Sequence, residues 1–83
     1  MDRTLGYLRE ILSNYMDRDS ISQHIYKRIQ KYSYHSEDEF IRDLQEEEIA
    51  FLNKILPDEI KHANEVNDRK RAYQLNEVYE LLI

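Results

Sequence analysis

Two long apolar patterns lie next to each other in the second half of the chain, on either side of a short polar turn. In each, large apolar side chains recur at steps of three or four residues, which is typical of one face of a helix. The first pattern consists of Ile49, Leu52, Leu56, Ile60, Ala63 and Val66, and the second of Ala72, Leu75, Val78, Tyr79 and Leu82. Between them, Asn67 and Asp68 suit a helix cap or a turn. The sequence therefore predicts a C-terminal hairpin of two amphipathic helices.

The same periodicity predicts three shorter helices in the first half, over residues 3–16, 21–32 and 37–44. Their apolar faces are formed by Leu5, Leu8, Leu12 and Tyr15, then by Ile21, Ile25, Ile29 and Tyr32, and then by Phe40, Ile41 and Leu44. Ser20 with Gln23, and Ser36 with Glu39, have the spacing of capping boxes. Residues 33–36 are expected to form a linker.

Pro57 and Gly6 lie within predicted helices, although both residue types are unfavourable in a helix interior. Proline in a helix interior removes one backbone hydrogen bond, so the fourth helix either kinks at Pro57 or breaks there. The apolar phase is unchanged across Pro57, which favours the kink. Gly6 lies either in a frayed first turn or at a close helix crossing, and the first interpretation is preferred.

The composition supports a helical fold throughout. The chain contains one glycine and one proline among 83 residues, and 35% of its residues are charged. Turn-rich sheets need more glycine and proline than this. The predicted fold class is all-α, a compact bundle of four to five helices in a single domain that covers residues 1–83.

The composition also restricts the expected setting of the protein. Cysteine is absent, which excludes a disulfide scaffold. The first residues lack the apolar stretch of a signal peptide, and the longest apolar run, residues 49–52, is too short to span a membrane. We therefore expect a cytoplasmic protein without a membrane segment.

No catalytic, phosphate-binding or cofactor motif is present, so neither an enzyme nor a cofactor is expected. The one glycine rules out a Gly-rich phosphate loop. Glu59 and His62 have the Glu-x-x-His spacing of di-metal bundles, but such bundles use this motif twice, and it occurs once here. We therefore interpret this pair as part of a solvated helix face and predict no metal site.

Residues 26–34 are the candidate interaction surface. The segment interleaves basic with aromatic side chains, a combination that can hold phosphates and stack on bases. Its candidate residues are Tyr26, Lys27, Arg28, Lys31, Tyr32 and Tyr34. Residues 36–83 carry six basic and thirteen acidic side chains, which repel a phosphate backbone. Nucleic acid is thus a poor partner, and the acidic run 46–48 is explained by the positive end of a helix dipole.

Seven tyrosines in so short a chain favour a protein partner or a homo-oligomer such as a dimer, because tyrosine is enriched at interfaces. The simpler interpretation places some tyrosines at the rim of the core and leaves the others exposed. It assigns Tyr7, Tyr15 and Tyr79 to the rim, and Tyr26, Tyr34 and Tyr73 to the solvent.

Several segments resemble a known family over nearly the whole length. These segments are residues 4–10, 39–40, 43–44, 51–53, 70–72 and 75–82. They are similar to CsgA of spore-forming bacilli, a small protein made in the forespore under sigma-G control and distinct from the curli subunit of the same name. That family is labelled a small acid-soluble spore protein, yet the glycine-containing segments and germination-protease site of the DNA-coating members are absent here. The resemblance implies a sporulation protein but supplies no site residue.

The expected function is therefore a non-enzymatic interaction or structural module of the forespore. The alternative is a regulator that binds nucleic acid or a transcription protein through residues 26–34.

Overall fold

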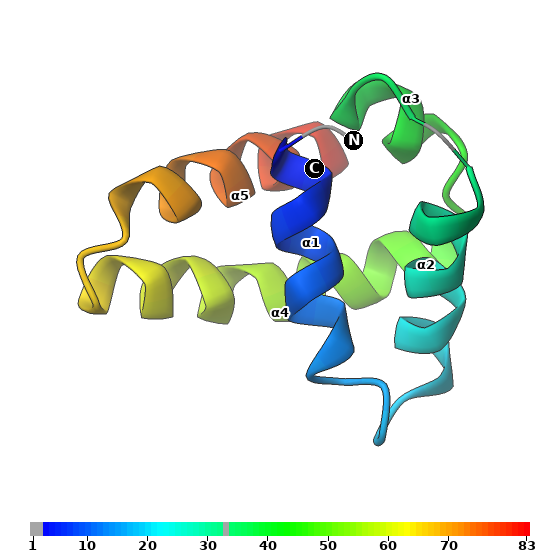
Figure 1. The fold of residues 1–83 in the computed structure, drawn as a ribbon, viewed down its shortest axis with the longest axis horizontal. Helices are drawn as coiled ribbons and strands as arrows, with labels where there is room; N and C mark the ends of the chain where they lie inside the picture. The colour runs from blue at the N-terminus through cyan, green and yellow to red at the C-terminus, as the bar shows by residue number, and fades with distance from the viewer. Residues whose placement is uncertain (1–2, 33) are drawn as a thin grey trace.

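The computed structural model describes residues 3–32 and 34–83, and these residues form five α-helices and no strand (Figure 1). The helices are α1 (Arg3–Ser13), α2 (Ser20–Lys31), α3 (Glu37–Arg42), α4 (Glu46–Glu65) and α5 (Arg69–Leu82). The predicted all-α class is confirmed. Ser33, the first residue of the predicted linker, lies outside the described residues.

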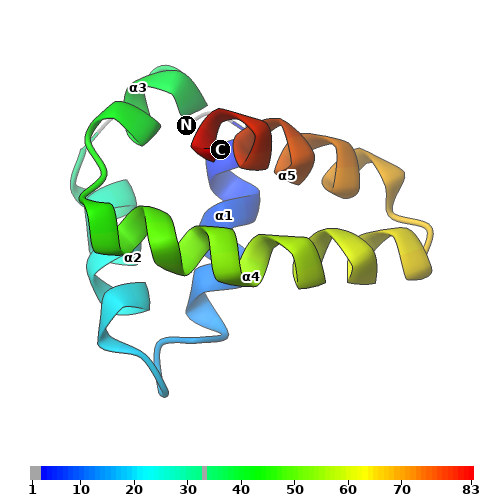
Figure 2. The ribbon, with the colours of Figure 1, turned by 180° about the vertical axis from the view of Figure 1, so that it is seen from behind.

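The C-terminal hairpin is the longest element of the fold, and α4 and α5 lie side by side along its length (Figures 1 and 2). Asn67 makes the reversal with a positive φ of 61°, a conformation that asparagine tolerates better than most residues. The backbone amide of Asp68 donates to the carbonyl of Ala63 at 2.8 Å. The backbone amide of Asn67 donates to the carbonyl of Asn64 at 3.1 Å. These two bonds form a Schellman cap, which satisfies carbonyls at the end of α4. The predicted turn is confirmed.

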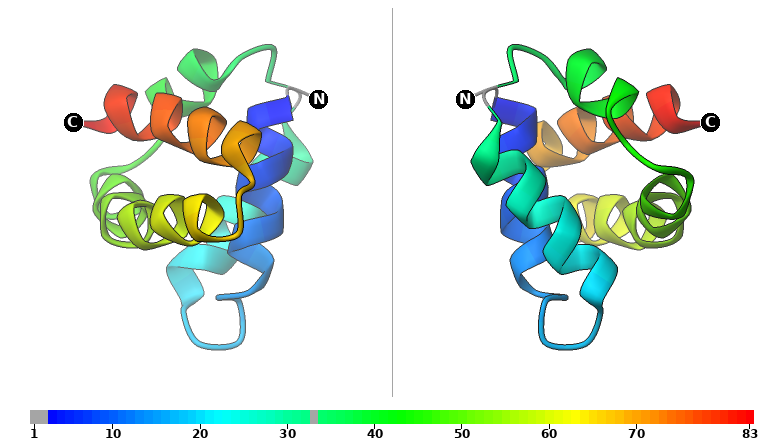
Figure 3. Two further views of the ribbon diagram at one scale, coloured as in Figure 1. Left: turned by 90° about the vertical axis from the view of Figure 1, so that its left-hand side faces the viewer. Right: turned by 90° about the vertical axis from the view of Figure 1, so that its right-hand side faces the viewer.

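The other three helices pack across this hairpin. Helix α1 crosses it and contacts α5, while α2 lies against both α1 and α4 (Figures 1 and 3). The short α3 covers the C-terminal part of α5 (Figure 2). The most deeply buried side chains come from all five helices and form one core: Leu5, Leu8, Ile11, Leu12, Ile25, Ile29, Phe40, Leu52, Leu56, Leu75 and Val78.

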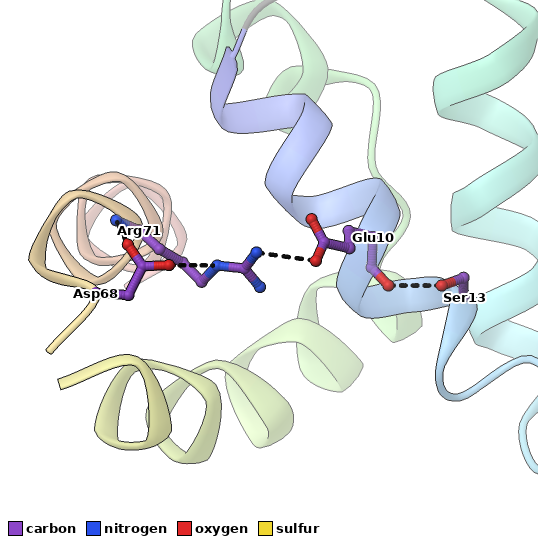
Figure 4. A network of polar contacts seen from close by, with 4 residues as sticks. All are labelled: Glu10, Ser13, Asp68 and Arg71. Atoms are coloured by element: carbon purple, nitrogen blue, oxygen red, sulfur yellow. Dashed lines mark hydrogen bonds and ion pairs between the residues drawn. The ribbon is translucent and has the colours of Figure 1, made fainter. Parts of the chain in front are cut away.

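An ion-pair network fixes the start of α5 against α1 (Figure 4). The Arg71 guanidinium pairs with Glu10 of α1 at 2.8 Å and with Asp68 at 3.3 Å. It also lies 5.1 Å from the centroid of the Tyr7 ring. The hydroxyl of Ser13 donates to the carbonyl of Glu10 at 2.6 Å, which caps the last turn of α1. Arg71 thus joins two helices that are distant in the sequence.

The start of α2 differs from its prediction. Asp19, not Ser20, is the N-cap: its backbone is extended, and its carboxylate accepts from the amide of Ile21 at 3.0 Å. The predicted Ser20–Gln23 capping box is wrong, because the Gln23 amide group instead donates to the carbonyl of Met16 at 2.7 Å. Aspartate and serine are nearly equal as N-caps, so local preference could not choose between the two adjacent residues.

Two helix ends also differ from their predictions. Helix α1 ends at Ser13 rather than at residue 16, and α3 ends at Arg42 rather than at residue 44. Val66, predicted in the core stripe of α4, is 59% exposed. It is the C-cap of α4 and follows the last helical turn, so the helical phase no longer determines the direction of its side chain.

Pro57 does not break α4, which runs without interruption from Glu46 to Glu65. The alternative of two separate helices is therefore excluded. The proline ring is exposed to solvent, and Leu56 before it and Ala63 after it are both buried, so the buried face of α4 continues across Pro57. The unchanged spacing of apolar residues across Pro57 therefore predicted correctly that the helix continues.

Replacing Gly6 with alanine should stabilise α1 and with it the whole protein. It lies within α1, and a Cβ atom built at this position meets nothing within 4 Å, which excludes the close helix crossing. We expect Gly6→Ala to raise the free energy of unfolding by about 0.5–1 kcal/mol, because alanine loses less backbone entropy in a helix. Urea denaturation followed by circular dichroism measures the change, and a lower midpoint would contradict it.

Candidate interaction surface

The second half of α2 and the residues after it hold the candidate side chains, and the structure divides them into two groups. Arg28 and Tyr34 are engaged inside the protein, and Tyr26 is partly buried against the core. Lys27, Lys31 and Tyr32 are exposed. The six residues therefore do not form one continuous basic and aromatic surface.

Arg28 forms the ion pair that joins α2 to α4. Its Nη2 lies 3.0 Å from Oε1 of Glu48, whose side chain is only 4% exposed, compared with 22% for Arg28. The same carboxylate oxygen accepts from the amide of Gln45 at 2.8 Å and so caps the start of α4. Partial desolvation opposes the charge of Arg28, but the Glu48 carboxylate outweighs it and raises the pKa of Arg28. Arg28 is thus held as a structural cation.

Tyr34 is buried, with 7% of its surface exposed, so its predicted exposure is wrong. Its hydroxyl donates to Asp43 Oδ2 at 2.8 Å, and its ring makes a T-shaped contact with the Phe40 ring at a centroid distance of 5.4 Å. Burial and the Asp43 carboxylate raise the pKa of Tyr34 to about 12, although Arg28 acts in the opposite direction. Tyr34 follows the end of α2, where the chain turns back to the core and helical periodicity gives no information.

Glu48 and Asp43 are the residues of this cluster that sequence reasoning missed. The helix dipole explains why Glu48 stands in the first turn of α4, but it gives no indication that this side chain is buried, with 3% exposed. Gln45 and Glu48 have the three-residue spacing of a capping box, and this signal could have distinguished Glu48 from its exposed neighbours Glu46 and Glu47. For Asp43 we find no comparable local signal, because its partner is in the linker before α3.

The exposed group forms a small surface on α2, and we call Lys27, Lys31 and Tyr32 the α2 patch. The Tyr32 ring is 48% exposed, and the Lys31 ammonium lies 5.5 Å from its centroid. Behind it, the Tyr34 ring lies 6.1 Å away at an angle of 58°. An exposed aromatic ring with one cation in contact and a second cation one helical turn away suits a partner that offers carboxylates beside an apolar group.

The remaining tyrosines follow the simpler interpretation with one correction. Tyr7, Tyr15 and Tyr79 are partly buried at the rim of the core, and Tyr73 is 66% exposed, as predicted. Tyr26 was expected to be exposed, but it also packs against the core. It lies one residue beyond Ile25 in α2, close enough to the buried face for its ring to reach the core.

The Glu59 and His62 pair does not converge on a common centre. The Tyr15 hydroxyl donates to Glu59 Oε2 at 2.9 Å, whereas His62 is exposed. Burial, together with the Glu59 carboxylate, raises the pKa of Tyr15. Across residues 3–32 and 34–83, no three histidine or acidic side chains are grouped so that they could hold a metal ion. In that same part of the chain, none of the helices has the length and apolar character needed to cross a membrane.

Comparison with known proteins places the chain in a family. The sequence model of the CsgA family, described as "Minor curli fiber component A", matches residues 1–83. The chain belongs to the CsgA family. A relative in Bacillus subtilis (strain 168), named "Sigma-G-dependent sporulation-specific SASP protein", is 51% identical over 83 residues, which cover 100% of both chains. No solved structure matches. The resemblance to the sporulation protein is thereby confirmed, and the relative's name differs from the curli description of the family.

The Arg28–Glu48 pair gives a prediction for stability. Arg28→Met leaves a buried carboxylate without its cation, and we expect a loss of about 2–4 kcal/mol in the free energy of unfolding. Arg42→Met is the matched control, because Arg42 pairs with Asp38 at 3.7 Å and both side chains are largely exposed. That control should change stability by less than about 0.5 kcal/mol. Equal losses in the two variants, measured by urea denaturation, would contradict a structural role for Arg28.

Tyr34 gives a prediction for alkaline pH. Its pKa is about 12 in the folded protein and 10.0 in the absence of structure, so folding favours the protonated phenol. The resulting stabilisation is complete below pH 10 and is lost as the pH rises through 12. We expect the ultraviolet titration of tyrosinate to show a component near pH 12 that Tyr34→Phe removes. A titration curve near pH 12 that the substitution leaves unchanged would refute the assignment.

Proposed function

We propose that this protein is a non-enzymatic interaction module of the forespore, and that the α2 patch contacts an acidic protein partner. The setting is supported by the relative of 51% identity, whose name describes a sigma-G-dependent, sporulation-specific protein. The contact is supported by the α2 patch, where the exposed Tyr32 ring at the C-cap of α2 lies 5.5 Å from the Lys31 ammonium, and Lys27 is exposed one helical turn before Lys31. Tyrosine is enriched at protein interfaces, and lysines beside it favour a partner of opposite charge.

The internal pairing of Arg28 favours a protein partner over nucleic acid. Arg28 was one of three cations in the predicted phosphate-binding segment, and Glu48 now neutralises it at 3.0 Å. Two lysines remain on the exposed face, and Tyr34, which could have stacked on a base, is buried. A surface with two cations releases few counterions from a phosphate backbone, so its binding to nucleic acid would be weak.

The α2 patch has the properties of a small, rigid docking surface. Its residues lie in the last two turns of α2 and at its C-cap, and α2 is anchored to α4 through Arg28 and to the core through Ile25 and Ile29. A preformed surface loses little conformational entropy on binding. The partner that fits it carries carboxylates beside an apolar or aromatic group.

Site-specific photo-crosslinking in sporulating cells tests this proposal. A photoreactive amino acid at position 32 should crosslink to a protein, whereas the same amino acid at position 54, exposed on α4, should not. The double charge reversal Lys27→Glu and Lys31→Glu should abolish the crosslink. The matched control Lys54→Glu and Lys61→Glu, which changes the net charge equally at exposed positions of α4, should leave it unchanged.

Three results would count against the proposal. Crosslinks of equal yield from positions 32 and 54 would indicate non-specific contact. A nucleic-acid adduct at position 32 would support the alternative regulator. The absence of any adduct at position 32 would exclude the α2 patch as the docking surface.

A further inference from the structure

The order of charges in α5 is unfavourable for a helix considered alone. Its three basic residues, Arg69, Lys70 and Arg71, stand in the first turn, and its two acidic residues, Glu77 and Glu80, stand in the C-terminal half. The helix dipole favours the reverse order, with acids at the start and bases at the end. Arg71 is explained by its pairing with Glu10 and Asp68, but Arg69, Lys70 and Glu80 are exposed. The same order becomes favourable when α5 lies antiparallel to a second helix with identical charges.

Exposed apolar side chains are also concentrated on this helix. In the part of the chain that the structure describes, three of the four large exposed apolar residues outside the α2 patch lie in α5 or at its C-cap, and the fourth is the C-cap of α4. They are Val66 at 59%, Tyr73 at 66%, Leu81 at 44% and Ile83 at 78% exposure.

One stripe of α5 combines these charges with an exposed aromatic ring. At 100° per residue, Arg69, Tyr73, Asn76 and Glu80 fall within a narrow sector of the helix surface, and all four are exposed. Val78 lies on the opposite side and is fully buried. The stripe therefore faces solvent over the length of α5.

The spacing of this stripe is self-complementary. If two α5 helices lie antiparallel about a two-fold axis midway between Gln74 and Leu75, Arg69 of one copy is opposite Glu80 of the other, and Tyr73 is opposite Asn76. Each contact occurs twice, as a two-fold interface requires. No shift in register is needed to align the two opposite charges, and the antiparallel helix dipoles also attract.

We propose that two copies of this protein pair through α5 in this antiparallel register. The hollows beside the stripe are consistent with the pairing. A groove of about 460 Å³ between α4 and α5 is lined by Ile60, Ala72 and Tyr73 and lies alongside the stripe, where a tyrosine ring of the second copy can pack. A second groove of about 480 Å³, between α3 and α5, is lined by Glu37, Asp38, Glu77 and Glu80. It lies beside the position of the second copy's Arg69.

The pairing is a contact of moderate size, made by one helix of 14 residues and the edges of two grooves. Stable interfaces commonly bury about 1,600 Å² in total, more than such a contact provides, so the dimer should form in a concentration-dependent manner. The surface differs from the α2 patch, and its existence does not depend on the proposed function. A dimer would leave both copies of the α2 patch available.

Charge-swap variants of the full chain, studied by analytical ultracentrifugation over a range of concentrations at low salt, test the pairing. The wild type should reach a dimer of twice 10.2 kDa. Arg69→Glu should weaken association about tenfold or more, because it places two pairs of like charges in contact. The double variant Arg69→Glu with Glu80→Arg should restore association, since both ion pairs reform with reversed polarity. Both substitutions also suit the helix dipole, so neither should harm the fold.

Lys70→Glu is the matched control, because it makes the same change in charge at an exposed residue next to the stripe. It should retain most of the association that Arg69→Glu loses, and Tyr73→Ala should lose association without loss of helicity by circular dichroism. A wild type that stays monomeric at the highest concentration would overturn the proposal. So would a dimer that all these variants leave intact, or a folded double variant that fails to associate.

Discussion

The fold depends on the packing of α4 against α5. Leu52 and Leu56 on one helix and Leu75 and Val78 on the other are completely or almost completely buried, and each of the remaining helices contacts at least one member of this hairpin or a helix that does. The Schellman cap at Asn67 sets the direction in which α5 returns. A chain of 83 residues has no disulfide and buries a limited fraction of its surface, so the position of this hairpin determines whether a common core can form at all.

Polar contacts then fix the positions of α1, α2 and α3, which the packing of the hairpin alone does not determine. Arg71 ties α5 to α1 through Glu10, and Arg28 ties α2 to α4 through Glu48. Tyr34 and Asp43 join the linker before α3 to the residue after it. Apolar burial has no direction and favours many arrangements of short helices, whereas paired charges and hydrogen bonds are satisfied in few of them. These contacts thus select one packing of α1, α2 and α3 around the hairpin.

In the segment 26–34, some side chains stabilise the fold and others remain exposed for binding. The segment 26–34 contributes Arg28 and Tyr34 to the interior and leaves Lys27, Lys31 and Tyr32 outside. Charges used internally cannot also recognise a partner, so the exposed remainder determines which ligands fit. On α5 the division is different, since Arg71 serves the fold while Arg69 and Glu80 are exposed, and the Glu80 carboxylate accepts a hydrogen bond from Asn76 on its own helix at 2.7 Å.

The sequence by itself determined the five helices, the all-α class and the hairpin with its turn at residues 67–68, because periodic apolar spacing and cap residues act over a few neighbouring positions. It also indicated that α4 continues through Pro57. The tertiary structure alone decided that Glu48 pairs with Arg28, that Tyr34 turns inward, and that Asp19 caps α2 in place of Ser20. Each of these outcomes depends on a group distant in the chain or on a choice between near-equal local states, and the spacing of neighbouring residues carries no information about either.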